Sequence, residues 1–217
     1  AQREKGGILG DGPMIGYAPI LNHALSERLV ALAEAASQHR LPVIMMASMS
    51  SAKFFGVKTF PKLVRVLNEA YDVPVISHLD HCTDPELLLA CAEAGFDSVM
   101  YDGSPLSFEE NTKITAELAE KCHKLGVFIE GELGVIAGEE GPVKSDFSVF
   151  TDPAMALEFC ERTGLDSLAV SIGNAHGFYK GRPEIQFDIL SEIAQKCSLP
   201  LVLHGGTGIP GSDIQKA

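Results

Sequence analysis

Three histidines in this sequence have the surroundings expected of metal ligands. His81 closes the run His78-Leu79-Asp80-His81, His176 lies in Asn174-Ala175-His176-Gly177, and His204 precedes Gly205-Gly206-Thr207-Gly208. One histidine after an apolar stretch is more often structural than functional. Three of them after separate stretches are hard to explain by packing, and a catalytic zinc site has three protein ligands and an open fourth position. We therefore predict that His81, His176 and His204 bind a metal, and interpret His78 as a residue that orients its neighbours.

Acidic residues accompany these histidines. Glu130 and Glu132 are two residues apart, so on a strand both side chains point to one face. Buried beside a cation, they suit either a second metal position or groups that orient the ligands. Asp80, next to a predicted ligand, is placed for proton transfer. Asp102 has two open interpretations, as a cap for the turn that follows it or as part of the site.

A glycine run and a long acidic segment complete the candidate chemistry. Gly205, Gly206 and Thr207 expose backbone N–H groups ahead of an expected helix, which is typical of a phosphate-binding turn. Residues 135–150 contain Glu140 and are expected to form a long connection. Connections longer than ~12–15 residues are often functional. Glu140 is therefore interpreted either as a base carried by a lid or as part of an exposed acidic loop.

Short apolar stretches alternate with helical patterns along the chain and would place these residues at strand ends. Strands are expected at 15–21, 43–47, 73–77, 98–101, 127–131, 167–172 and 201–204. Helices are expected at 26–39, 60–70, 85–94, 108–125, 153–162 and 187–196. Continuously apolar strands are typical of parallel sheets covered on both faces. Asp84 and Asp152 precede prolines as N-cap residues, and Gly95, Gly126 and Gly164 follow helices.

This alternation predicts an α/β protein with the (β/α)8 TIM-barrel fold, whose active sites lie at the C-terminal ends of the strands. A doubly wound open sheet is disfavoured, because Gly10-Asp11-Gly12 precedes the first expected strand instead of following it. A barrel takes ~250 residues, or about 31 per unit. The 217 residues, which begin with Ala1, are thus expected to form one domain, incomplete at both ends and truncated before the eighth strand.

The net charge and the cysteine content indicate which kinds of partner and compartment to expect. The chain carries 17 Lys and Arg against 29 Asp and Glu, a formal charge of −12, which argues against nucleic-acid and anionic-membrane partners. A phosphorylated substrate would then need a metal, glycine N–H groups or helix ends to hold it. The five cysteines form no C-x-x-C pair and indicate free thiols in a cytoplasmic protein.

In combination, the motifs resemble those of the class II, zinc-dependent ketose-bisphosphate aldolases, and most closely the shorter fructose- or tagatose-bisphosphate branch. The resemblance extends from about Ile15 to the end of the chain, in the order of the family. It is carried by five runs: His78-Leu79-Asp80-His81, Asp102-Gly103-Ser104, Glu130-Gly131-Glu132-Leu133-Gly134, Asn174-Ala175-His176-Gly177 and His204-Gly205-Gly206-Thr207-Gly208.

The resemblance implies a role for each matching position. His81, His176 and His204 would bind the catalytic Zn²⁺, and Asp102 and Glu132 would hold a second divalent position, with a monovalent cation as a further ligand of the site. Asp80 would handle the proton on the C4 oxygen, and Glu140 the C1 proton of dihydroxyacetone phosphate. The substrate contacts implied are Asn22, Ser48, Gly177, Gly205, Gly206 and Thr207. A homodimer or homotetramer is also implied.

The implied reaction is zinc-dependent aldol cleavage or condensation of a ketose 1,6-bisphosphate, fructose or tagatose, to dihydroxyacetone phosphate and glyceraldehyde 3-phosphate. A Schiff-base version is disfavoured, because no expected strand end carries a lysine. Two alternatives stay open. One is a related class II aldolase for another phosphorylated sugar or sugar acid, and the other is a catalytically inactive barrel fragment that only binds metal or a partner subunit.

Overall fold

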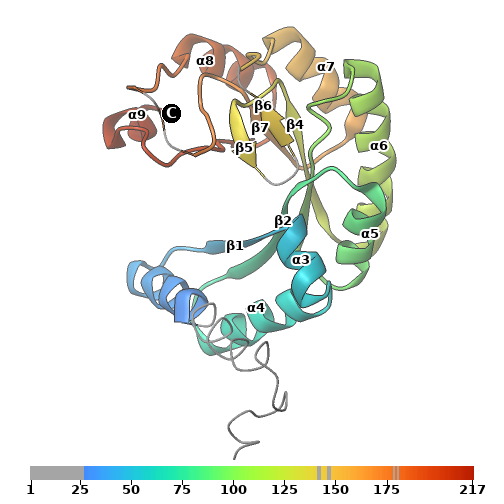
Figure 1. The fold of residues 1–217 in the computed structure, drawn as a ribbon, viewed down its shortest axis with the longest axis vertical. Helices are drawn as coiled ribbons and strands as arrows, with labels where there is room; N and C mark the ends of the chain where they lie inside the picture. The colour runs from blue at the N-terminus through green and yellow to red at the C-terminus, as the bar shows by residue number, and fades with distance from the viewer. Residues whose placement is uncertain (1–26, 141–142, 146–147, 178, 180) are drawn as a thin grey trace, which may run out of the picture. The chain divides into compact units, whose positions relative to one another are not determined.

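The computed structural model describes residues 27–140, 143–145, 148–177, 179 and 181–217 (Figure 1). The expected first strand, 15–21, and Asn22 lie outside these residues. The described chain packs as two compact units. The smaller contains residues up to 45 together with 63–76, and the larger contains residues 46–62 and 77–217.

The smaller unit is built around a helix at 27–39, whose buried side chains Leu29, Ala33 and Ala36 repeat at helical spacing. It includes the beginning of strand β1 (Val43–Ser48), the second half of helix α4 (Thr59–Ala70) and the first residues of strand β2 (Val75–Cys82). The Val43 N–H donates to the Pro74 carbonyl at 2.9 Å, and the Val75 N–H donates to the Asn68 side-chain oxygen at 2.9 Å.

The larger unit holds a parallel sheet. Its strands are β2, β3 (Ser98–Tyr101), β4 (Phe128–Leu133), β7 (Ser167–Val170) and β8 (Leu201–Val202), paired in that order. Its helices are α3 (Met49–Phe55), α5 (Pro85–Glu93), α6 (Phe108–Leu125), α7 (Pro153–Thr163), α8 (Phe187–Lys196) and α9 (Gly211–Lys216). Helices α5 to α8 lie on the outer side of the strands (Figure 1). No described helix is both long and apolar enough to cross a membrane.

Local sequence explains where the helices begin and end. The Asp84 carboxylate accepts from the backbone N–H groups of Glu86 and Leu87, and Asp152 caps α7 in the same way. Ser107 and Glu110 form a reciprocal capping box at the start of α6. Helices α6 and α7 end at glycines in the left-handed conformation, Gly126 and Gly164. The predicted aspartate caps, each directly before a proline, and these two glycine stops are confirmed.

Strands β3, β4 and β7 together contain one exposed residue, Phe128, as expected for a sheet covered on both faces. Strand β3 and helices α6 and α8 have the predicted bounds, but β2 and β4 extend beyond theirs and include His81 and Glu132. One helix and one hairpin were not predicted. Ser48 caps the short helix α3, and residues 135–150 contain an antiparallel hairpin, β5 (Gly138–Glu140) and β6 (Val143–Ser145).

Candidate metal centre

Strand β2 brings two neighbouring residues to the same site. On a regular strand, Asp80 and His81 would point to opposite faces. Pairing between β2 and β3 shifts register between Leu79 and Cys82, and His81 has a left-handed φ of 42°. A bulge of this kind re-aims a side chain and is common beside active sites. Asp80 and His81 consequently line one cavity.

That cavity, of about 260 Å³, collects most of the predicted site residues. Besides Met46, Val202 and Leu203, its lining consists of Asp80, His81, His176, Gly177, His204, Gly205, Gly206 and Thr207. The residues come from β2 and from the segments that follow β7 and β8, so they meet at the C-terminal ends of parallel strands, where the sequence placed them.

The three histidine rings lie in contact. The centroid of the His81 ring is 4.7 Å from that of His176 and 4.4 Å from that of His204. One ring nitrogen of each histidine lies within 4.8 Å of the others, and His81, Asp102 and Glu132 form a second such group. His81 and His204 are buried and His176 is half-buried.

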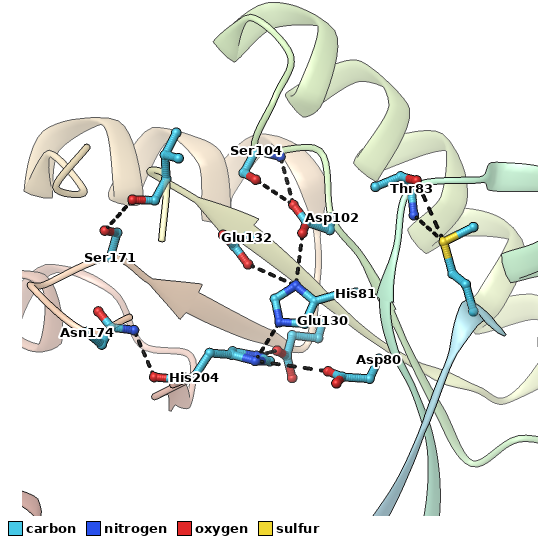
Figure 2. Close-up of polar contacts among 12 residues, drawn as sticks. Asp80, His81, Thr83, Asp102, Ser104, Glu130, Glu132, Ser171, Asn174 and His204 are labelled. Atoms are coloured by element: carbon cyan, nitrogen blue, oxygen red, sulfur yellow. Dashed lines mark hydrogen bonds and ion pairs between the residues drawn. The ribbon is translucent and has the colours of Figure 1, made fainter. Parts of the chain in front are cut away.

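Carboxylates hold the outer nitrogens of two of these rings (Figure 2). His81 Nδ1 lies 2.9 Å from Asp102 Oδ2, and His204 Nε2 lies 2.8 Å from Glu130 Oε1. Ionised carboxylates only accept hydrogen bonds, so both of these nitrogens carry hydrogen. The inner nitrogens, His81 Nε2 and His204 Nδ1, face each other at 2.9 Å. Two lone pairs at that distance require a positive charge between them, either a proton or a metal ion.

The electrostatics of the protein agree with this arrangement. Burial lowers the pKa of His81, but the Asp102 hydrogen bond and the charges of Glu132, Asp80 and Asp102 outweigh it and raise the pKa to about 9. Burial and the neighbouring His81 and His204 lower the pKa of His176 to about 4, so this ring stays neutral. Burial, followed by the Asp102 charge, raises the pKa of Glu132 well above its ordinary value. A bound cation would instead favour the charged form of Glu132.

The donor set fits a divalent cation. Asp80 Oδ1, Glu132 Oε2 and His176 Nε2 are buried without a hydrogen-bond partner, as is His78 Nε2. A buried polar atom left unpaired costs about 1–3 kcal/mol. A cation between the histidines would account for His176 Nε2 and Asp80 Oδ1, and nitrogen ligands with carboxylates nearby suit Zn²⁺. Glu132 Oε2 lies 3.5 Å from the outer nitrogen of His81, in the second group.

Asp102 makes contacts of both kinds between which the sequence left a choice, to the turn that follows it and to His81. Its Oδ1 accepts from the Ser104 N–H at 3.1 Å and the Ser104 hydroxyl at 2.6 Å, which caps the turn, while its Oδ2 holds His81. Burial raises the pKa of Asp102, and the hydrogen bonds from His81 and Ser104 outweigh it and lower the pKa below its usual range.

The remaining predicted residues lie elsewhere. The Ser48 hydroxyl accepts from the Ser51 N–H at 3.3 Å and is part of the α3 cap. Glu140 ends β5 and pairs with Val143. The hairpin starts near the site, because the Ala137 carbonyl accepts from the His176 N–H at 2.8 Å.

The structure places three further residues at the site, and of these the sequence suggested a role only for Glu130, as a metal position or a group that orients the ligands. Glu130 contacts His204. The Asn174 amide donates to the His204 carbonyl at 3.0 Å, and its oxygen accepts from the Ile172 N–H. The Tyr179 hydroxyl donates to the Gly205 carbonyl at 2.9 Å and accepts from the Ala175 N–H at 2.8 Å. Glu130 and Asn174 belong to runs quoted above, but nothing in the sequence signals Tyr179.

Comparison with known proteins assigns the family. A family model described as class II fructose-bisphosphate aldolase matches residues 16–217. The fructose-bisphosphate aldolase of Staphylococcus epidermidis and the probable fructose-bisphosphate aldolase of Bacillus subtilis are each 43% identical over 190 residues, or 86% of this chain. This chain belongs to the class II fructose-bisphosphate aldolase family. It spans 66% of the length of the first relative and 67% of the second.

Solved structures agree. The YdjI aldolase from Escherichia coli K12 is 36% identical with a TM-score of 0.76, over 87% of this chain and 66% of that one. A putative fructose-1,6-bisphosphate aldolase from Coccidioides immitis is 32% identical with a TM-score of 0.80, over 87% and 68%. With parallel strands alternating with helices, these neighbours confirm the predicted α/β fold of TIM-barrel type.

Proposed function

We propose that this chain carries the zinc site and part of the substrate site of an aldolase that cleaves a ketose 1,6-bisphosphate, fructose or tagatose, to dihydroxyacetone phosphate and glyceraldehyde 3-phosphate. One observation carries the proposal. Three histidines with mutually close ring nitrogens share a cavity with Asp80 and with the glycine turn after β8. The family and its named relatives support the reaction type.

The residue roles follow from donor chemistry. His81 through Nε2, His204 through Nδ1 and His176 bind Zn²⁺, because these nitrogens face one another. Asp102 and Glu132 hold a second divalent position beside His81. A monovalent cation binds as a further ion of the site. When bound, the metal acts as a Lewis acid at the substrate carbonyl, which stabilises the negative charge that develops during proton removal.

The chain's own residues move protons and hold the substrate. Asp80 transfers the proton of the C4 oxygen, since its unpaired Oδ1 lies 4.0 Å from His204 Nδ1. Glu140 handles the C1 proton. Gly177, Gly205, Gly206 and Thr207 bind phosphate through backbone N–H groups at the cavity edge, and Ser48 and Asn22 contribute further contacts.

The wider setting is also a proposal. We infer one aldolase domain over residues 1–217 that works in cytoplasmic carbohydrate metabolism, in glycolysis, as a homodimer or homotetramer. Its partners are phosphorylated small molecules, not nucleic acid or membrane.

Turnover and metal content, measured together, test the function. The 217-residue protein is assayed with fructose 1,6-bisphosphate, tagatose 1,6-bisphosphate and a phosphorylated deoxy sugar acid, after chelation and after return of Zn²⁺. We expect bisphosphate cleavage that a chelator abolishes and Zn²⁺ restores. Full activity in excess chelator would contradict the metal role, and metal binding without turnover would favour the inactive fragment.

A further inference from the structure

Glu130 is a buried acid to which the proposed function assigns no role. It lies on β4 two residues before Glu132 and is 6% exposed, although a carboxylate is costly to bury without partners. Its two oxygens contact different groups. Oε1 lies 2.8 Å from His204 Nε2, and Oε2 accepts from the Ser167 hydroxyl at 3.4 Å.

The backbone fixes Glu130 in this position. Strands β4 and β7 are parallel neighbours, and Glu130 pairs in register with Ser167, so the hydroxyl lies beside the carboxylate. His204 is held independently, because its carbonyl accepts from the Asn174 amide. Glu130 therefore reaches only one nitrogen of the His204 ring, the one that points away from His81 (Figure 2).

We propose that Glu130 is the positioning residue that fixes the tautomer and orientation of His204, so that Nδ1 is presented to the metal. This rests on the proposed function, because it assumes that His204 is a ligand. Asp102 makes the equivalent contact to Nδ1 of His81, so the two acids orient two rings in opposite senses. A carboxylate that accepts a hydrogen bond from a histidine ligand selects one tautomer of the ring and raises the basicity of the nitrogen that binds the metal.

The tautomer of the His204 ring affects how tightly the site binds metal. Without Glu130, the ring can hold its hydrogen on either nitrogen, and only one of the two tautomers leaves Nδ1 free to bind. Metal binding then includes the cost of selecting that tautomer. Loss of such an orienting group typically weakens metal binding or activity by about 10–100-fold.

Three variants of the full chain test this, with metal affinity as the main readout. Zn²⁺ binding is measured by competition with a chromophoric chelator for the parent and for Glu130→Gln, Glu130→Ala and the matched surface control Glu120→Gln. Glu120 is exposed and pairs only with Lys124 among the described contacts. We expect zinc affinity to fall by about 10-fold in Glu130→Gln and by up to about 100-fold in Glu130→Ala, with no change in the control.

A second readout separates positioning from general loss of structure. Long-range ¹H–¹⁵N spectra of the zinc-free protein should show His204 of the parent with its hydrogen on Nε2 alone, and a mixture of the two tautomers in Glu130→Gln. Parent-like affinity and an unchanged His204 tautomer in Glu130→Gln would overturn the proposal. If Glu130→Ala fails to fold, the zinc affinity and the His204 tautomer of the nearly isosteric Glu130→Gln variant test the proposal. A parent that binds no zinc would instead contradict the proposed function.

Discussion

His81 Nε2 lies 2.9 Å from His204 Nδ1, although the two residues are 123 positions apart in the chain. The outer nitrogen of each ring faces a carboxylate, so the two inner nitrogens can only share a proton or bind a common cation. This one relationship gives the site its preference for a positive charge.

Substitution of a ligand and of the neighbouring acid should have different effects. His176→Ala is expected to lower zinc content from about one ion per chain, because it removes one of three protein ligands. Asp80→Ala should keep the zinc and lower turnover by about 10²–10⁴-fold, the usual contribution of a general acid–base group. Metal analysis and steady-state assays on the same preparations measure both. Equal zinc loss in the two variants would show that Asp80 is itself a ligand.

Two adjacent glycines of the turn after β8 should differ in their tolerance of alanine. At Gly205, φ is +64° and a Cβ would lie 2.3 Å from the Ala175 carbonyl oxygen. At Gly206, a Cβ would meet no atom within 4 Å. We expect Gly205→Ala to lower the free energy of unfolding by about 1–3 kcal/mol, the usual cost of a strained backbone position, and Gly206→Ala to leave it nearly unchanged. Urea unfolding measures this difference, and equal stability of the two variants would contradict it.

The sequence predicted most of the elements because their signals are local. Capping acids, glycine stops and continuous apolar strands depend on a few neighbouring residues, and β3, α6 and α8 have the predicted bounds. The hairpin at 138–145 was predicted as an unstructured connection. Gly138 pairs with Ser145 in this hairpin. The residues between them have no alternating apolar pattern that would predict two strands.

The site was predicted by residue type more successfully than by geometry. Histidines and acids at expected strand ends indicated the cluster, but regular alternation would have turned His81 away from Asp80. The bulge and the left-handed φ at His81 bring the two together, and neither can be read from the sequence. The contact of Glu130 with His204 depends on strands β4 and β8 being close in space, which is likewise a property of the folded chain.

Tyr179 connects the segment that carries His176 with the glycine turn, and its hydroxyl can be tested by removal. Tyr179→Phe leaves the Ala175 N–H and the Gly205 carbonyl without this partner. Because the turn would no longer be fixed, we expect KM for a bisphosphate substrate to rise about tenfold, an effect of ~1.4 kcal/mol, while zinc affinity stays unchanged. Kinetics and chelator competition measure the two effects. Weaker zinc binding at unchanged KM would assign Tyr179 to the metal ligands instead.

Buried thiols should make the fold sensitive to alkaline pH. Burial raises the pKa of Cys82 and Cys122 to about 11 and that of Cys91 to about 12, from an ordinary value of 9.0. All three side chains are fully buried. Above about pH 9 the unfolded chain releases these protons and the folded chain keeps them, so stability is complete below that pH and falls as the pH rises toward 11–12.

Each thiol should contribute a slope of about 1.4 kcal/mol per pH unit once the unfolded thiol is ionised. Urea unfolding of the reduced protein between about pH 8 and pH 10.5 measures the total slope. Cys91→Ala supplies the comparison, because it removes one titrating group and leaves the lysines and tyrosines that also ionise in this range. Near pH 10.5, the stability of Cys91→Ala should fall less steeply with pH than that of the parent, by about 1.4 kcal/mol per pH unit. An identical slope would mean that Cys91 ionises in the folded protein as readily as in the unfolded chain, contrary to its burial.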